Sequence, residues 1–139
     1  MRFPRKGRNK HGNIEVVRGG RVFSSRLEAR RASELELLQK AGKIHDLKYQ
    51  VPFELIPAQY EDYETGEIFK KGPLKGQPKV KRRCIERSCV YVADFTYVTD
   101  SGKYVVEDTK GDKTEKYIIK RKLMLYLKKI RIKEVTKND

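Results

Sequence analysis

Two stretches decide the fold of this chain: Val92-Ala93-Asp94-Phe95-Thr96-Tyr97 and, after a short turn, Val105-Val106-Glu107-Asp108-Thr109-Lys110. Their β-branched and aromatic residues predict two neighbouring strands. Each strand also carries acid where a buried strand would favour Val or Ile, namely Asp94 in the first and Glu107 with Asp108 in the second. Acids at such positions indicate a site within the strands.

A tight hairpin is expected to join the two strands. Asp100-Ser101-Gly102 places a glycine where a three-residue loop needs the left-handed backbone region. This loop pairs Thr99 with Lys103, and counting back along both strands brings Asp94 opposite Asp108. Opposite residues of an antiparallel pair share a face, with Cβ atoms roughly 5 Å apart.

Two carboxylates this close repel each other, so they need a cation, or one of them stays protonated. Strand alternation places Lys110 on the same face. A loop of two or four residues would instead bring Glu107 opposite Asp94, but the position of the glycine favours the three-residue loop. The alternative to a functional site is a structural pair of Asp94 and Asp108 neutralised by Lys110.

The composition describes a basic chain, predicted to form a single domain over residues 1–139. Its formal net charge of +14 predicts binding to polyanions, nucleic acid first and an anionic membrane surface second. No apolar run has transmembrane length and no signal peptide is evident, which predicts a soluble intracellular protein without a membrane partner. Residues 1–20 are predicted to form a basic arm that contacts phosphates.

A helix is expected before the two strands, after an irregular lead-in over residues 16–23. Ser24 or Ser25 is the predicted N-cap, and Glu28 stands at the capping-box distance from Ser25. The helix should end at Ala41, because a glycine follows. The expected buried stripe consists of Leu27, Leu35 and Leu38. Glu28 lies on the shoulder of that stripe and can reach the edge of the packed surface, or else it serves only as a capping partner.

Residues 47–55 alternate like a strand, and Pro52 predicts an edge position or a bulge. In residues 57–88 an acidic, aromatic half is followed by a basic half broken by Gly and Pro, which predicts a long loop or a protruding hairpin. Its Lys81-Arg82-Arg83 run is expected to contact DNA, and the alternative is a solvated insertion. Gln50 either lines the site or pairs only locally.

After the second strand, the pattern predicts a helix over about residues 115–128 and an alternating strand over 130–135. The core residues expected on this helix are Ile119, Leu123 and Leu127. A polar set either holds the nucleic-acid backbone or forms a solvated face: Lys113, Thr114, Lys116 and Lys120. Because the last strand follows a crossover helix, it should lie parallel to its neighbour. The predicted fold is α/β, an αβββαβ core with a mixed central sheet flanked by helices.

This order of elements resembles the PD-(D/E)XK nucleases, the restriction-endonuclease-like superfamily. Their signature is an acid on one central strand and (D/E)-x-K on the next, matched here by Asp94 and by Asp108-Thr109-Lys110. Glu28 matches the helix glutamate of archaeal Holliday-junction resolvases and of a transposase-associated nuclease. The resemblance covers most of residues 21–135.

Three motifs resemble still more closely a family of small, phage-encoded proteins of uncharacterised function. They read Phe23-x-Ser25-x-x-Glu28, Tyr91-x-Ala93-Asp94-Phe95 and Val106-Glu107-Asp108-x-Lys110-Gly111. Two departures from the superfamily pattern matter. Ala93 stands where Pro is common, and the Glu107-Asp108 doublet leaves open which acid faces the metal.

Hydrolysis of a phosphodiester needs an activated water and charge stabilisation, and carboxylate oxygens suit Mg²⁺ or Mn²⁺ ions that supply both. Asp94 and Asp108 are therefore predicted metal ligands, and Lys110 would orient the water or hold the scissile phosphate. The resemblance adds the carbonyl of Thr109 as a ligand, with Glu28 completing the site directly or through water.

The sequence thus predicts a metal-dependent DNA endonuclease acting on branched or recombination DNA, or a nicking enzyme. The alternatives are a non-catalytic nucleic-acid-binding protein on the same scaffold and a nuclease subunit active only within a larger complex. The resemblance implies a homodimer, phage replication or recombination partners, and the cytoplasm of a bacterial host. Cys84 and Cys89 form either half of a zinc site, with His45 or His11, or a pair of free thiols.

Overall fold

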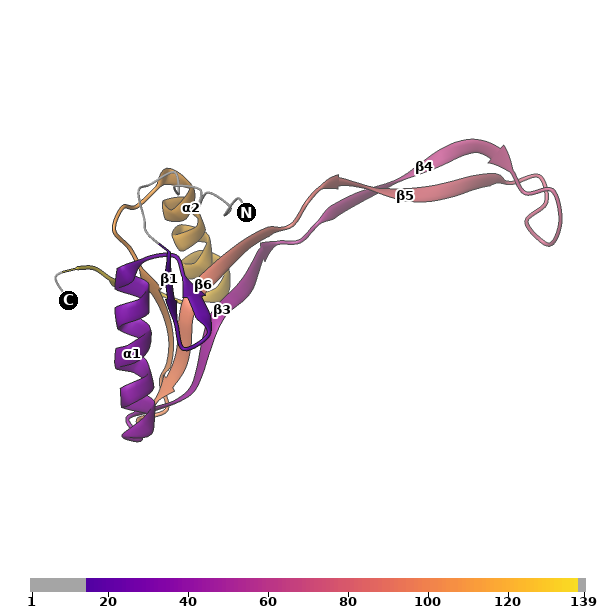
Figure 1. Cartoon of the computed structure of the whole chain (residues 1–139). Helices are drawn as coiled ribbons and strands as arrows, with labels where there is room; N and C mark the ends of the chain where they lie inside the picture. The colour runs from indigo at the N-terminus through magenta and orange to yellow at the C-terminus, as the bar shows by residue number, and fades with distance from the viewer. Residues whose placement is uncertain (1–14, 138–139) are drawn as a thin grey trace, which may run out of the picture. The chain divides into compact units, whose positions relative to one another are not determined.

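The computed structural model describes residues 15–137, and Figure 1 shows it with most of its helices and strands labelled. The segment Phe53–Tyr91 forms one compact unit, and the described residues on either side of it form another. None of the helices within residues 15–137 has both the length and the apolar character that crossing a membrane requires. Most of the predicted basic N-terminal arm, and His11, lie outside the described residues.

A four-stranded sheet carries the fold. It consists, in spatial order, of β3 (Ile44–Ile56), β6 (Cys89–Thr99), β7 (Tyr104–Thr109) and β8 (Lys133–Val135). β6 and β7 are antiparallel whereas β7 and β8 are parallel, which confirms the predicted mixed sheet. β3, which contains Pro52, is an edge strand as predicted. With one helix before β3 and another before β8, the predicted α/β class and element order are confirmed.

The loop between β6 and β7 has the three-residue form that the sequence predicts. The Thr99 N–H donates to the carbonyl of Lys103 at 2.9 Å, and the Gly102 N–H donates back to the carbonyl of Thr99 at 2.9 Å. Gly102 has φ +87°, a left-handed conformation that glycine adopts without strain. A local feature of the sequence therefore sets the register of the central hairpin.

The register of the hairpin pairs Phe95 with Glu107, and the next step along both strands brings Asp94 opposite Asp108. The alternative register, with Glu107 opposite Asp94, is wrong. Regular pairing stops at Phe95 and Glu107, and the Thr109 N–H donates instead to the carboxylate of Asp94 at 2.9 Å. The site thus lies where the ladder between β6 and β7 ends.

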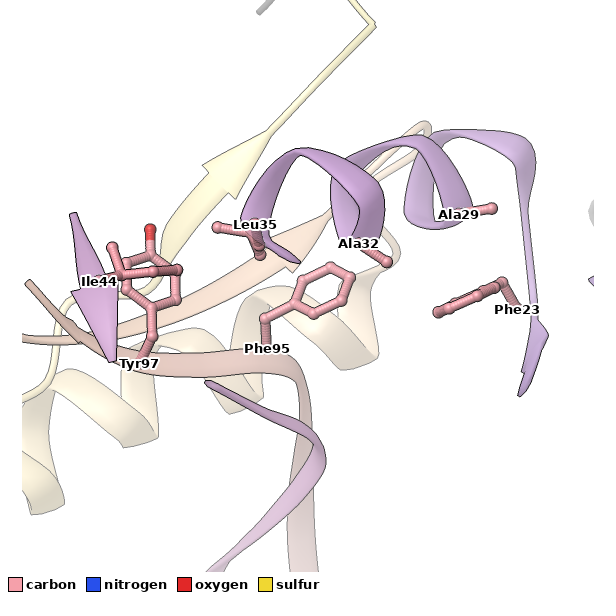
Figure 2. Packing of buried hydrophobic residues seen from close by; sticks show 7 residues of the cluster. All are labelled: Phe23, Ala29, Ala32, Leu35, Ile44, Phe95 and Tyr97. Carbon is pink, nitrogen blue, oxygen red and sulfur yellow. The ribbon is translucent and has the colours of Figure 1, made fainter. Parts of the chain in front are cut away.

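Helix α1 (Arg26–Lys40) packs on the sheet through small side chains. Its buried residues are Glu28, Ala29, Ala32 and Leu35, and Figure 2 shows Ala32 beside the ring of Phe95 of β6 and Ala29 nearer to Phe23. The predicted leucine stripe is wrong in its margins, because Leu38 is partly exposed and Leu27 only half-buried. Alanines at the interface let the helix backbone approach the aromatic side chains closely.

The segment before α1 is a β-hairpin, which corrects the predicted irregular lead-in and shortens the predicted arm. β1 (Val16–Arg18) pairs antiparallel with β2 (Arg21–Phe23). Gly19 and Gly20 between them both have positive φ, +56° and +78°. Two consecutive left-handed residues are what a two-residue hairpin turn of type I′ requires, so the Gly-Gly pair was its sequence signal.

Helix α2 (Glu115–Leu123) continues directly into the π-helical turn η1 (Met124–Lys128), together spanning the predicted helix. Its buried residues are Tyr117 and Met124. The predicted core positions Ile119 and Leu127 are wrong, since both are exposed. Within α2 the buried face runs through Tyr117 rather than Ile119. Beyond it, the π-helical turn takes more residues per turn than an α-helix, so extrapolation at helical spacing misplaces Leu127.

β4 (Gln59–Ile68) and β5 (Pro78–Glu86) pair antiparallel as a separate two-stranded sheet. Residues 59–86, called the ribbon below, therefore form a hairpin, one of the two forms predicted for the insertion. The compact unit Phe53–Tyr91 is wider than the predicted insertion, because it includes the adjoining ends of β3 and β6.

Candidate active site

Asp94 on β6 is held at the end of the ladder by Thr109 of β7. Its Oδ2 accepts hydrogen bonds from the Thr109 N–H (2.9 Å) and the Thr109 hydroxyl (2.8 Å). Burial and then the charge of Glu28 raise the pKa of Asp94, while the bonds from Thr109 and the charge of Lys110 oppose that rise. Glu28 and Lys110 therefore both act electrostatically on Asp94, as the sequence predicted for neighbours.

Asp108 and Lys110, two residues apart on and just beyond β7, form an ion pair of 2.9 Å between Oδ1 and Nζ. The Asp108 side chain is buried, and Lys110 also lies 4.2 Å from the ring centroid of Tyr117 on α2. The Lys110 N–H donates to the carbonyl of Val135, which fixes this end of β7 against β8. The cation predicted to offset the paired acids is thus present.

Glu28 is buried at the start of α1 and is satisfied on both oxygens. Its Oε2 accepts from the Ser24 N–H (3.0 Å) and hydroxyl (2.6 Å), while its Oε1 accepts from the Gln50 amide at 2.8 Å. Of the two serines predicted as N-cap, Ser25 is the one observed, since its hydroxyl accepts from the Glu28 N–H. Glu28 therefore both caps the helix and reaches β3.

Gln50 is a residue whose role the sequence left open between lining the site and pairing locally. Its bond to Glu28 spans 22 positions, so the pairing is not local. Its φ is +50°, a left-handed conformation that costs a non-glycine residue roughly 1–2 kcal/mol. Strained backbone of this kind clusters at functional sites, where the surrounding structure holds it.

Glu107 faces away from Asp108 and is occupied by other partners. Arg31 of α1 donates to it through Nε and, at 3.1 Å, through Nη2, and the Tyr97 hydroxyl donates at 2.6 Å. The hydrogen bond to Glu107 raises the pKa of Arg31. Of the Glu107-Asp108 doublet, Asp108 is therefore the acid on the face of Asp94 and Lys110. Sequence reasoning missed Arg31, because no local pattern links it to a partner 76 positions away.

The predicted nucleic-acid-binding set after β7 separates in the structure. The Lys113 ammonium lies 2.6 Å from Glu134 of β8, and the Thr114 hydroxyl accepts from the Tyr117 N–H as the N-cap of α2. Lys116 is exposed, and Lys120 is partly buried. Lys81, Arg82 and Arg83 belong to the ribbon.

Carboxylate oxygens supply the donor chemistry that Mg²⁺ or Mn²⁺ prefers. Both hydrogen bonds to Asp94 from the described residues reach Oδ2, and none reaches Oδ1. Within residues 15–137, no three His, Cys, Asp or Glu side chains are gathered closely enough to hold an ion as they stand. The same search covers the suggested zinc site with His45 but not the one with His11, which lies outside the described residues. Cys84 is an exposed free thiol, and Cys89 is a half-buried one.

The chain belongs to the DUF1064 family, described as a protein of unknown function, whose model matches residues 8–138. A search of curated proteins and a search of solved structures each found no significant match. The family agrees with the expected resemblance to a small uncharacterised family, and it leaves the nuclease resemblance as a proposal.

Proposed function

We propose that this protein is a metal-dependent DNA endonuclease of the PD-(D/E)XK type, acting on branched or recombination DNA or as a nicking enzyme. The observation that supports this most is the arrangement around the end of the β6–β7 ladder. Asp94 stands opposite Asp108 with Lys110 beside it, and Glu28 acts on Asp94 from α1. A buried ion cluster is a costly way to stabilise a hairpin, which favours a functional reason for it.

In this proposal Asp94, Asp108 and the Thr109 carbonyl would hold Mg²⁺ or Mn²⁺, and Glu28 would complete the set directly or through water. The ion would activate a water and offset charge on the phosphate. Lys110 is a compact positive charge already held 2.9 Å from Asp108, so it can orient the nucleophilic water or bind the scissile phosphate. Gln50 and Ser24 position Glu28 through their hydrogen bonds.

The net charge of +14 supports DNA as the substrate because phosphate contacts dominate the affinity for nucleic acid. Cutting both strands of a junction symmetrically requires two copies, so the proposal includes a homodimer. The cytoplasm of a bacterial host, and phage replication or recombination proteins, would be its setting and partners.

A second candidate is a nucleic-acid-binding protein without catalysis, or a nuclease subunit that needs a larger complex. It is favoured by one observation: among the described residues, the three acids are not gathered as a ready ligand set. Each is instead held by donors of the protein itself.

A plasmid-nicking assay tests the proposal. Wild-type protein should nick supercoiled plasmid with Mg²⁺ or Mn²⁺ and stop when EDTA is added. Asp94→Asn and Asp108→Asn should each reduce the rate by a factor of about 100 or more, of the order seen when one charge-stabilising group is removed. Asp112→Asn is the matched control, because Asp112 is exposed and lies just beyond Lys110. Equal nicking by Asp108→Asn and wild type would dismiss the site, and no cleavage of any DNA form would favour the second candidate.

A further inference from the structure

Six of the seven cations of the ribbon between Lys70 and Arg83 divide into two groups, of which the first stabilises the ribbon itself, while Lys81, exposed on β5, belongs to neither. Arg83 on β5 lies 2.5 Å from Glu61 and 4.7 Å from the ring centroid of Tyr63, both on β4. Arg82 and Lys79 make the same two kinds of contact, each with one acid and one ring across the hairpin. A two-stranded sheet is marginally stable alone, so such cross-strand pairs hold it together.

The second group lies in the tip, residues 69–77, which joins β4 to β5. Lys70, Lys71 and Lys75 are exposed there, and none makes an ion pair within residues 15–137. Residues 69–83 contain seven basic side chains and no acidic one, so no acid of the tip offsets these charges. The three lysines are therefore available to an anionic partner.

The tip is an ordered loop. The Phe69 N–H donates to the carbonyl of Gln77 at 3.0 Å, and the Gly76 N–H donates to the carbonyl of Phe69 at 2.8 Å. Inside this closure, the Lys75 N–H donates to the carbonyl of Gly72 at 3.1 Å. These bonds present a fixed surface and leave little backbone entropy to lose on binding.

Pro73 and Leu74 stand between the lysines at the turn of this loop. Leu74 is 46% exposed, an apolar side chain with cations on both sides of it in the chain. Proteins that bind the DNA minor groove combine basic side chains on the phosphates with an apolar wedge that enters between base pairs. Charge and shape at the tip fit that pattern.

We propose that the ribbon tip binds duplex DNA in the minor groove. Lys70, Lys71 and Lys75 contact phosphates, and Leu74, backed by Pro73, wedges between base pairs and bends the duplex. This deepens the proposed function and rests on it for the class of ligand, since DNA is the partner assumed there. The tip would supply affinity and substrate shape, while Arg82 and Arg83 keep the ribbon folded.

Fluorescence anisotropy of full-length protein on a 30-base-pair duplex in EDTA tests the lysines without any cleavage. The triple variant Lys70→Gln, Lys71→Gln, Lys75→Gln should flatten the slope of log affinity against log salt by about 3, roughly 1 for each phosphate that the protein no longer neutralises. The matched control is Lys40→Gln, Lys43→Gln, Lys48→Gln, which removes the same charge from exposed lysines of α1 and its surroundings. An equal change in both triples would overturn the proposal.

The wedge has its own test. Leu74→Ala should weaken duplex binding without changing the salt slope, and it should reduce bending measured by energy transfer between dyes on the duplex ends. Leu37→Ala, a substitution of another exposed leucine, on α1, is the control and should change neither. Unchanged bending with Leu74→Ala, or stronger tip-dependent binding to single-stranded DNA or to phosphatidylserine vesicles, would refute the minor-groove assignment.

The two proposals fail separately. Tip-dependent binding to duplex by a protein that never nicks plasmid would remove the nuclease and keep the tip. Nicking that depends on Asp108, by a protein whose tip variants bind as wild type, would remove the tip and keep the nuclease.

Discussion

The buried ion pair between α1 and β7 should be a principal support of the fold beside the candidate site. Glu107 has no exposed surface and accepts three hydrogen bonds, two from Arg31 and one from Tyr97. Arg31→Met removes two of the three and leaves a buried carboxylate with one donor. Breaking a buried pair from one side costs about 3–5 kcal/mol, so this variant should lose about that much stability.

Glu107→Gln should cost less, about 1–2 kcal/mol, because Arg31 keeps its 2.9 Å bond to Glu34 and part of its exposure to water. The double variant should be more stable than the two single losses predict, since removing both partners leaves no unpaired charge. The coupling should be about 2 kcal/mol. The control is Arg30→Met, which breaks only an exposed pair of 3.7 Å with Glu34 and should cost less than about 1 kcal/mol.

Urea unfolding followed by far-ultraviolet circular dichroism measures all four variants. The reasoning is refuted if Arg31→Met costs no more than Arg30→Met, or if the single losses add to the double loss within about 0.5 kcal/mol. Because Arg31 lies one turn after Glu28, and Glu107 precedes Asp108, Arg31→Met should also slow plasmid nicking at temperatures where it remains folded.

Other substitutions probe the site directly. Asp94→Asn should raise the melting temperature at pH 7, because burial and the charge of Glu28 raise the native pKa of Asp94 above its ordinary value of 3.8. The stability of the wild type therefore falls as pH rises through that native pKa. The gain in melting temperature should shrink as pH is lowered toward 3.8, and a difference that does not change with pH would contradict the reasoning. Gln50→Gly should change stability by less than about 1 kcal/mol, because relief of backbone strain offsets loss of the hydrogen bond to Glu28, but it should slow nicking about tenfold. The control is Asp46→Gly, at φ +56° on the same strand, which should leave nicking unchanged. Mg²⁺ at a hundred times its dissociation constant should stabilise the wild type by about 2.7 kcal/mol. At that same Mg²⁺ concentration, Lys110→Gln should be stabilised more, because the ion no longer competes with the Lys110 ammonium for Asp108, and it should lose nicking. Calorimetry and the plasmid assay measure the two effects.

The sequence predicted the features that local signals determine. The Asp100-Ser101-Gly102 loop sets the hairpin register, and with a period of two that register alone places Asp94 opposite Asp108. Ser25 and Glu28 likewise mark the start of α1 within a few residues of chain.

The features that could not be predicted from the sequence depend on interactions between distant elements. Arg31 meets Glu107 across 76 positions, and nothing near either residue announces the partner. The buried face of α1 follows Ala29 and Ala32, whose small side chains give a weaker hydrophobic signal than the leucines on its margin. Gln50 adopts a left-handed conformation that a pattern of alternating residues cannot reveal.

The pairing of each acid with a donor of the protein has a consequence for how the proposed enzyme would work. Asp108 and Lys110 neutralise each other, so the metal-free site carries less repulsion than its acids alone would produce. An ion that bound Asp108 would compete with Lys110, and the displaced ammonium would then need another anion, which the scissile phosphate of the proposed substrate would provide. Ion and DNA should therefore bind more tightly together than separately, as reciprocal coupling between two ligands requires. Such coupling would restrict activation of water to the complex that already holds substrate.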